Sequence, residues 1–343
     1  MREIRSRGYI VTLKEADISI SSETQFICSK TFATGELNTE EYDALLKNSL
    51  VETIEPDIEV QACEETWEKV RVGCLLNSTR KYNKNIDADI FILDTGVQKN
   101  HPLLNVVSSL CFIKGEEEIT DDLNGHGTMS AGCSGEKELG IAPDARIHSY
   151  RVLRKDGFGF FSGIISAVEA VISFKKNNPE KNVIINLSLA GYTGTTEYNA
   201  LDKIIVIAIK TYNITVIIAA GNDGKDASLY GPAHIKEAIT VGSYNKNNRF
   251  SSFSNYGNFV NILAPGESIY TTTINSNKTY GSGTSFAAPY VSGAAALYLS
   301  QNKDKKPSDV FKKLKELASN PNNPLISNIP KNTATTSLYV EKL

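Results

Sequence analysis

The stretch Ile90-Phe91-Ile92-Leu93-Asp94 is a short, almost continuous apolar run that ends in an acid. A run of this length without polar alternation is typical of a strand that is covered on both faces, as strands of parallel sheets are. Three further runs have the same character, and they occupy residues 183–187, 215–219 and 238–241. The sequence therefore predicts at least four buried parallel strands.

Stretches with a helical period lie between these runs. After Ser162, which we predict as a helix cap, apolar residues recur three and four apart; they are Ile164, Ile165, Val168, Val171 and Ile172. A second set with this spacing is Leu201, Ile204, Ile205 and Ala208. Strands and helices that alternate in this way predict parallel βαβ units with right-handed crossovers. The predicted fold class is α/β, a doubly wound and mostly parallel sheet, in which ligands bind beyond the carboxyl ends of the strands.

Three short segments bring catalytic residue types to the ends of these elements. Asp94 ends a buried strand, where a charge needs a partner. Residues 124–128 (Asn-Gly-His-Gly-Thr) place His126 between two glycines, which allow close approach of the backbone. Residues 281–285 (Gly-Ser-Gly-Thr-Ser) open an apolar helix, and free N–H groups at a helix start favour negative charge near Ser285.

Together these segments supply a nucleophile, a base and a group that orients the base. Serine is a weak nucleophile, so Ser285 needs a base such as His126 to take its proton. Asp94 would hold the imidazole in the required tautomer. The oxyanion of a tetrahedral intermediate needs hydrogen-bond donors, and Asn222, just past a predicted strand, offers one while the backbone N–H of Ser285 offers the other.

Each of these residues alone also has an ordinary structural interpretation. A serine before a helix is usually a cap, and Asn222 beside Gly221 could be a turn residue. Pro289 is predicted in the first turn of a helix over residues 286–299, where N–H groups have no helical partner. The combination of the three segments, rather than any one of them, favours catalysis.

At these residues the sequence resembles the subtilisin-like serine proteases, most closely their proteinase K-like branch. The matching segments, in the order Asp, His, Ser, are residues 94–96, 124–128, 219–222, 251–257, 263–266 and 283–289. The resemblance covers about residues 87–300. It implies a serine endopeptidase that hydrolyses polypeptides through an acyl-enzyme intermediate, with Asp94, His126, Ser285 and Asn222 as catalytic residues.

The resemblance also implies where the substrate binds. Ser188, Leu189 and Ala190 look like the strand that pairs with an extended peptide, and Gly221 would border the pocket for the side chain before the cut. Ala190 stands where the family usually has glycine, and Phe286 stands where it usually has methionine. No long acidic or basic run lies near these motifs, which favours broad specificity with an apolar preference.

The N-terminal region differs from the rest of the chain. Two stretches alternate like half-buried strands, residues 8–14 and 51–55. Between them, Asn38 or Thr39 is predicted to cap a short helix with acidic residues in its first turn. The resemblance implies that residues 1–62 are an inhibitory propeptide, a small α+β ferredoxin-like unit that is cleaved from the peptidase domain, residues 63–343, somewhere in residues 61–66.

Composition and charge argue against several other classes. The net charge of −3 and the pI of about 5.9 give no basic excess for nucleic acid. No apolar run approaches the roughly 18–20 residues of a membrane span, and the N-terminus has no apolar core of a signal peptide. We therefore expect an intracellular or leaderless protein, and a monomer. The five cysteines are odd in number and show no CxxC spacing, which argues against a zinc site and favours reduced thiols.

The resemblance implies no cofactor for the chemistry, and we predict no metal ligands. A structural calcium ion has little support, because Asn245 stands where proteinase K-like sequences have a calcium-binding aspartate. His101, His148 and His234 are interpreted as structural. Two other functions compete with the protease: a pseudoprotease that binds peptides without cutting, and a nucleotide-binding enzyme, which the lack of glycine-rich phosphate motifs disfavours.

Overall fold

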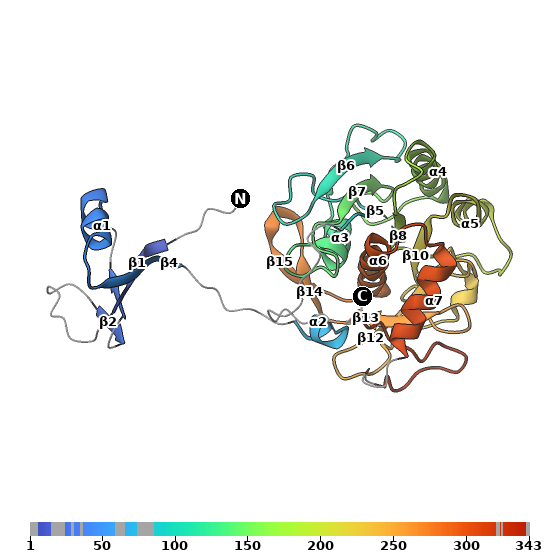
Figure 1. The fold of residues 1–343 in the computed structure, drawn as a ribbon. Helices are drawn as coiled ribbons and strands as arrows, with labels where there is room; N and C mark the ends of the chain where they lie inside the picture. Colours follow the sequence, from blue (N-terminus) through green and yellow to red (C-terminus); the bar gives the residue numbers. More distant parts are fainter. Residues whose placement is uncertain are drawn as a thin grey trace. The chain divides into compact units, whose positions relative to one another are not determined.

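The structure is a computed structural model of the 343-residue chain. It describes residues 6–14, 25–28, 31–34, 37–58, 66–73, 86–319, 323 and 325–340. Contacts divide the chain into two compact units, Met1–Glu64 and Glu65–Leu343. Figure 1 shows the elements of each unit.

The first unit is an antiparallel sheet with one described helix. Its elements are β1 (Ser6–Leu13), β2 (Gln25–Cys28), β3 (Thr31–Thr34), α1 (Thr39–Leu46) and β4 (Val51–Ile58), and the strand order is β2-β3-β1-β4. Val11 and Leu13 form its small buried core. A ferredoxin-like unit has the element order βαββαβ. Residues 15–24, where its first helix would lie, are outside the described residues, so the ferredoxin-like class stays a prediction.

Of the two cap residues predicted for the helix of this unit, Asn38 is confirmed, whereas Thr39 is the first residue of α1. The Asn38 side chain accepts a hydrogen bond from the N–H of Glu41, and the Glu41 carboxylate accepts one from the N–H of Asn38, each at 2.9 Å. This reciprocal capping box satisfies two donors that the first turn leaves free. The two predicted strands are also present as β1 and β4, whereas β2 and β3 were not foreseen.

The second unit is built on a seven-stranded sheet in which all neighbouring strands are parallel. Across the sheet the strands are β13 (Ile262–Pro265), β12 (Ile239–Tyr244), β10 (Thr215–Ala219), β8 (Val183–Leu187), β5 (Asp89–Asp94), β7 (Arg146–Arg151) and β6 (Val106–Cys111). All four strands predicted from apolar runs are among them.

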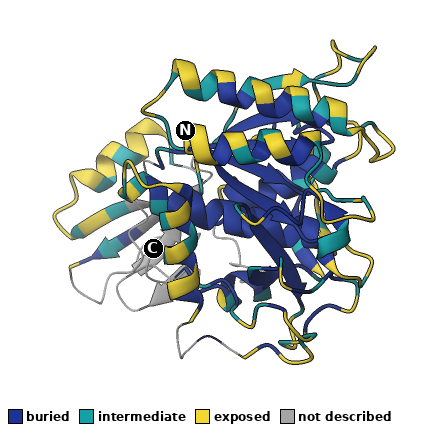
Figure 2. Ribbon diagram, turned by 90° about the vertical axis from the view of Figure 1, so that its right-hand side faces the viewer, coloured by how far each residue is buried: buried dark blue, intermediate teal, exposed yellow. Residues whose placement is uncertain are grey.

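Helices cover both faces of this sheet. Those on one face are α3 (His126–Gly135), α6 (Thr284–Gln301) and α7 (Pro307–Ala318), and those on the other are α4 (Phe161–Asn177) and α5 (Ala200–Tyr212). In β5, Ile90 and Ile92 belong to the first core, whereas Phe91 and Leu93 belong to the second. Because each side of the strand faces a core, its sequence shows no polar alternation. Figure 2 shows the buried strands between helices whose outer sides are exposed.

The strand order reverses between β5 and β8, which are neighbours in the sheet: the chain adds strands on one side of β5 first and then on the other. β6 and β7 lie on one side of β5, and β10, β12 and β13 lie beyond β8 on the other. At such a switch point the loops diverge beyond the carboxyl ends of the strands and leave room for a ligand. Asp94 is the last residue of β5 and Ser188 directly follows β8, so two predicted site residues flank this point.

Shorter elements complete the second unit. They are α2 (Trp67–Arg71), the ribbon of β14 (Ile269–Thr272) with β15 (Lys278–Gly281), the pair of β9 (Gly191–Tyr192) with β11 (Tyr230–Gly231), and the 3₁₀ turns η1 (Ala227–Leu229) and η2 (Ile274–Ser276). The predicted cap Ser162 is wrong, because α4 begins at Phe161 and Phe160 is the N-cap. Phe160 has the extended backbone of an N-cap, so Ser162 lies inside the first turn.

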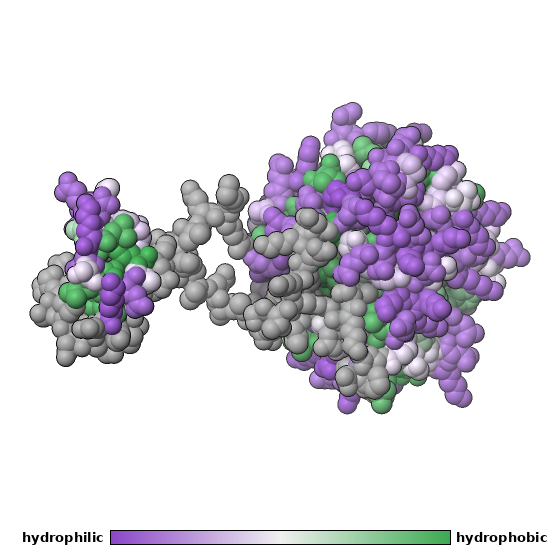
Figure 3. All heavy atoms as spheres, in the orientation of Figure 1, coloured by the Kyte–Doolittle hydropathy of each residue, from purple (hydrophilic) through white to green (hydrophobic). Residues whose placement is uncertain are grey.

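The visible surface of the second unit in Figure 3 is mostly hydrophilic, with apolar areas that are small and scattered. This is expected where the apolar residues of strands and helices fill the interior. Within the described ranges, no helix combines the length and the apolar character needed to cross a membrane.

Candidate active site

Asp94 is a fully buried residue at the carboxyl end of β5. Its Oδ1 accepts hydrogen bonds from the N–H of Thr95 and from Nδ1 of His126, each at 2.7 Å. Because an ionised carboxylate can only accept, Nδ1 of His126 carries the hydrogen, and Nε2 of the neutral ring is left to accept a proton. The structure thus brings the predicted acid and base together.

His126 is the first residue of α3, and its side chain is 29% exposed. Burial of the ring disfavours its charged form, but the charge of Asp94, the hydrogen bond to Asp94 and the charge of Asp122 together outweigh burial. The pKa of His126 therefore lies above its ordinary value. Gly127 allows α3 to start this close to β5, because a Cβ there would lie 1.9 Å from the carbonyl oxygen of Gly96.

Asp122 is a buried acid in the loop before His126, and the sequence alone indicates no role for it. Its Oδ1 accepts from the hydroxyl of Thr95 at 2.9 Å and from the N–H of Gly125 at 2.8 Å. Its Oδ2 accepts from the N–H and the hydroxyl of Thr128, at 3.0 and 2.7 Å. Asp122 therefore ties the loop after β5 to the first turn of α3. No local pattern marks Asp122 in the sequence, because Gly125 and not Asp122 is the N-cap of α3.

Ser285 is the second residue of α6 and only 8% exposed. No hydrogen bond joins its Oγ to His126 in the described part of the chain. The neighbouring Phe286 lies against the His126 ring, with 5.4 Å between ring centroids. The three predicted triad residues are thus at one rim of the sheet, with Asp94 and His126 bonded and Ser285 beside them. Serine–histidine hydrogen bonds are often loose without substrate and tighten in the complex.

The predicted position of Pro289 is wrong. α6 begins at Thr284, two residues earlier than expected, so Pro289 lies in the second turn. Since proline has no N–H, the carbonyl of Ser285, four residues earlier, lacks its helical partner. The hydroxyl of Ser188 donates to that carbonyl at 2.7 Å. Because Pro289 leaves the Ser285 carbonyl without a helical donor, that carbonyl can accept the hydrogen bond from Ser188, which links the start of α6 to the loop after β8.

Asn222 follows β10 and faces the start of α6. Its Oδ1 accepts from the N–H of Thr284 at 2.8 Å and from the hydroxyl of Thr284 at 2.9 Å. Because a backbone N–H can only donate, the amide is held with its oxygen toward Thr284, and Nδ2 donates to no residue in the described ranges. The N–H of Ser285, in the first turn of α6, also has no acceptor within the helix. Two free donors therefore occur at the start of α6.

The residues predicted to bind substrate lie along the same rim. Ser188 is buried, whereas Leu189 and Ala190 are half-buried. Neither Leu189 nor Ala190 makes a backbone hydrogen bond to another described residue, so their N–H and C=O groups remain available. Gly221 has φ of +100°, and a Cβ there would lie 2.4 Å from Nδ2 of Asn255 and 3.6 Å from the Cβ of Ala190. Gly221 and Ala190 are therefore neighbours at this rim.

Comparison with known proteins identifies this arrangement. The model of the subtilase family, Peptidase_S8, matches residues 87–337. The chain belongs to the subtilase family. The predicted family and the predicted α/β class are thereby confirmed, and this subtilase is a serine-type endopeptidase.

Relatives support the assignment over most of the chain. This subtilase is 32% identical over 317 residues to the cuticle-degrading protease of Metarhizium anisopliae, and the match covers 88% of this chain and 79% of the relative. It is 39% identical over 229 residues to the extracellular serine proteinase of Thermus sp. (strain Rt41A). This match covers 64% of the present chain and 52% of the relative, so the chain spans about half of that relative's length. The crystal structure of a cold adapted subtilisin-like serine proteinase matches with a TM-score of 0.68 and 33% identity, over 80% of this chain and 98% of the other.

The Asn245 side chain of this subtilase is used within the protein. Its Oδ1 accepts from the N–H of Asn247 at 3.1 Å and from the N–H of Arg249 at 3.2 Å. Those bonds shape the turn after β12. Among the residues that the structure describes, no group of three or more His, Cys, Asp or Glu side chains is placed to hold a metal ion.

Two other histidines have structural partners. His101 shares a hydrogen bond of 2.9 Å with the hydroxyl of Thr272, and His234 shares one of 3.0 Å with the carboxylate of Asp202. Cys111 and Cys133 are free thiols, and burial raises the pKa of Cys133 to about 12, so this thiol is uncharged at neutral pH. Cys63 and Cys74 lie outside the described residues.

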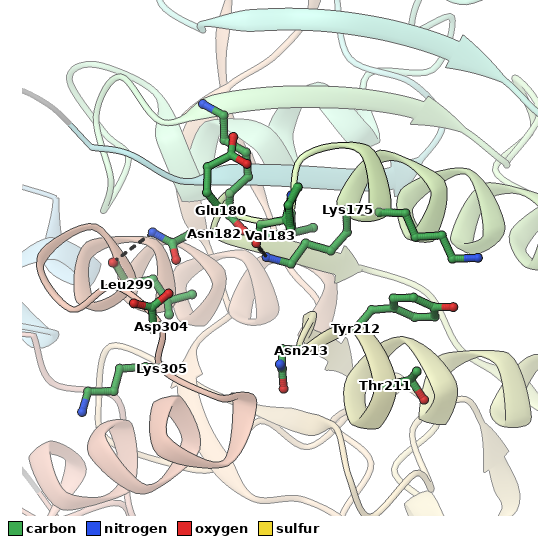
Figure 4. Close-up of a pocket in the computed structure, with 13 residues that line it drawn as sticks. Lys175, Glu180, Asn182, Val183, Thr211, Tyr212, Asn213, Leu299, Asp304 and Lys305 are labelled. Carbon is green, nitrogen blue, oxygen red and sulfur yellow. Dashed lines mark hydrogen bonds between the residues drawn. The ribbon is translucent and has the colours of Figure 1, made fainter.

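A cavity of about 400 Å³ lies at the amino end of β8, away from these residues. The C-terminal ends of α4, α5 and α6 line it, and Figure 4 shows its lysines pointing in different directions. The ammonium of Lys175 is occupied, because it donates to the carbonyls of Pro179 and Lys181, each at 2.6 Å. The cavity contains none of the predicted site residues.

Proposed function

We propose that this subtilase cleaves peptide bonds with Ser285 as nucleophile, His126 as base and Asp94 as the group that orients His126. The observation that carries the proposal is the hydrogen-bonded pair of Asp94 and His126, at the rim where α6 begins with Ser285. The second support is the Asn222 amide, held with its N–H groups free beside the same helix start.

In the first step Oγ of Ser285 attacks the carbonyl carbon of the peptide bond, and Nε2 of His126 takes the hydroxyl proton. Asp94 stabilises the resulting imidazolium by its charge and its hydrogen bond, the two interactions that also raise the pKa of His126. The negative oxygen of the tetrahedral intermediate is bound by Nδ2 of Asn222 and the N–H of Ser285.

The imidazolium then gives its proton to the leaving amine, and an acyl group remains on Ser285. In the second half of the reaction, His126 takes a proton from water, and the resulting hydroxide attacks the acyl carbonyl. Release of the acid restores the Ser285 hydroxyl. Asp94 keeps the same ring orientation in both halves, so one base serves two attacks.

The substrate is an extended polypeptide that pairs with the free backbone groups of Leu189 and Ala190. Gly221 leaves space for the side chain before the cut. Exposed apolar side chains follow the segments at this rim, among them Leu123, Phe160 and, in β9, Tyr192, and these support broad specificity with an apolar preference.

We also propose that residues 1–62 are an inhibitory propeptide that this enzyme removes from itself. The support is the division of the chain into two compact units at Glu64, close to the expected cleavage in residues 61–66. Residues 61–65 lie outside the described residues.

The test is a time course on the purified full chain and on its Ser285→Ala variant, following chain mass and hydrolysis of unfolded casein. We expect the wild type to lose about 60 N-terminal residues and to digest casein, while the variant does neither. A folded variant that still digests casein would refute the assignment of Ser285. A folded wild type that stays whole and inert would favour a pseudoprotease that only binds peptides.

A further inference from the structure

A second set of serine, histidine and aspartate side chains is hydrogen-bonded at the opposite end of the sheet. Ser108 Oγ and His148 Nδ1 lie 2.7 Å apart, and His148 Nε2 lies 2.8 Å from Oδ1 of Asp89. Since the carboxylate only accepts, Nε2 carries the hydrogen, and Nδ1 is left to accept the Ser108 proton. The serine, the base and the orienting acid thus have the hydrogen-bond directions of a nucleophilic relay.

A β-bulge aims Ser108 at this histidine. The consecutive residues Ile147 and His148 of β7 pair with Val106 and Ser108 of β6, so Val107 is an extra residue. With a regular register, Val107 would face His148 and no hydroxyl would reach the ring. Bulges are frequent at sheet edges and beside functional residues, where they redirect one side chain.

The acid of this set stays ionised, and the ring is held in place. Burial of Asp89 opposes its charge, but hydrogen bonds from Arg146 and His148 outweigh burial and lower the pKa of Asp89 to about 2. Phe91 stacks on the His148 ring at 4.1 Å between centroids, and Phe174 packs edge-on at 5.1 Å. The imidazole therefore keeps one orientation toward Ser108.

Ser108 lies on β6, which is an edge strand of the sheet (Figure 1). Ser108 itself is half-buried, and its neighbours Val107 and Leu110 are exposed. Ser108 does not lie at the start of a helix, and its described contacts include no side-chain amide. The two donors found beside Ser285 therefore have no counterpart in the described contacts of Ser108. Hydrolysis of a peptide bond requires protonation of the amine leaving group and hydrogen-bond donors for the oxyanion. A peptide is therefore a poor substrate at Ser108.

We propose that Ser108 is a second nucleophile of this protein, which accepts acyl groups from small activated esters with His148 as general base. Oγ of Ser108 forms a bond to the acyl carbon, and its proton moves to Nδ1 of His148. The ester C–O bond breaks, the phenolate leaves, and the proton is returned to it or to solvent. The product is an O-acyl serine at residue 108.

The test uses the full-length Ser285→Ala variant, in which the proposed peptidase nucleophile is absent and the residues of this second set are unchanged. The variant is incubated with p-nitrophenyl acetate, and the acetylated residues are mapped by peptide mass spectrometry. We expect Ser108, although half-buried, to be acetylated about 10²-fold faster than the exposed Ser252, the size of a general-base effect. Adding His148→Gln should reduce acetylation of Ser108 about 10²-fold.

Acetylation of Ser108 no faster than that of Ser252 would overturn the proposal, and so would acetylation of His148 without transfer to Ser108. Because the Ser108 rate is measured with His148 intact, the proposal is tested even where His148→Gln does not fold. The outcome is independent of the proposed function, since casein hydrolysis by the wild type tests Ser285 alone.

Discussion

β5 carries an aspartate at each end, and each aspartate binds a histidine. At the carboxyl end Asp94 contacts His126, and at the amino end Asp89 contacts His148. The surroundings differ. The remaining oxygen of Asp94 has no hydrogen-bond partner among the described residues, whereas Asp89 is held on both oxygens by Arg146.

The serines of the two ends differ even more. Ser285 lies at a helix start beside the free amide of Asn222, and Ser108 lies on an edge strand. If proteolysis is confined to the Ser285 end, as we propose, then a hydrogen-bonded serine, histidine and aspartate are not sufficient for a peptidase. The groups that bind the oxyanion and the extended chain are what separate the two ends.

The largest expected difference between the two ends is in the serines. Ser285→Ala should lower kcat for casein by about 10⁶-fold, the size known for loss of the nucleophile in subtilisin. Ser108→Ala, the matched change at the other end, should leave kcat within about twofold of wild type, because no step of proteolysis uses Ser108. A comparable loss in both variants would remove the distinction.

The two aspartates sharpen the comparison through pH. Asp94→Asn should lower kcat by about 10⁴-fold, the size known for this change in other triads. The base must be neutral, so activity falls as the pH drops through the pKa of His126. Since Asp94 raises that pKa, the residual activity of Asp94→Asn should persist to lower pH than that of the wild type. A pH–rate profile of both proteins checks the direction.

The matched change Asp89→Asn should leave the pH profile of proteolysis unchanged. It should instead destabilise the fold by about 2 kcal/mol, because the charged hydrogen bonds from Arg146 to a buried carboxylate are lost. Urea unfolding measures this. A shifted pH profile in Asp89→Asn would show that the two ends are coupled.

Removing the proposed oxyanion donor Asn222 tests whether such donors account for the proposed difference in peptide cleavage between the two ends. Asn222→Ala should lower kcat about 10²–10³-fold with little change in KM, the magnitude known for the corresponding donor in subtilisin. Acetylation of Ser108 should not change, because no donor of this kind acts there. An unchanged kcat would refute the role of Asn222.

Asp122 gives the smallest effect. Asp122→Asn keeps the size of the side chain but removes the charge that binds Thr95 and Thr128. We expect kcat to fall about tenfold through poorer placement of His126. The acid limb of the pH profile should move to lower pH, because the charge of Asp122 contributes to the raised pKa of His126. Asp121→Asn, an exposed neighbour, is the control and should show neither change.

Much of this site could be predicted from the sequence because its parts are local motifs. The apolar run before Asp94 predicts a strand end, and the glycines around His126 and before Ser285 predict tight turns at helix starts. The helix boundary at Ser285 was less accessible, because Thr284 and Ser285 are polar and the apolar pattern starts only at Phe286. The position of Pro289 was wrong for that reason.

The residues that the sequence did not reveal depend on contacts between distant segments. Asp122 is recognised only when Thr95 and Thr128 are seen around its carboxylate. Ser108 meets His148 only because of a register shift between two strands, which no local pattern indicates. Such pairings follow from the packing of the sheet rather than from spacing along the chain.

The most direct test of the central claim is to find which serine reacts when the wild-type protein is inactivated. The protein is treated with phenylmethanesulfonyl fluoride until casein hydrolysis stops, and the modified residue is mapped by mass spectrometry. We expect the loss of casein hydrolysis to follow sulfonylation of Ser285 in proportion, whether or not Ser108 also reacts, and modification of Ser285 to be much slower in Asp94→Asn. Loss of casein hydrolysis with Ser285 unmodified and Ser108 modified would contradict this expectation.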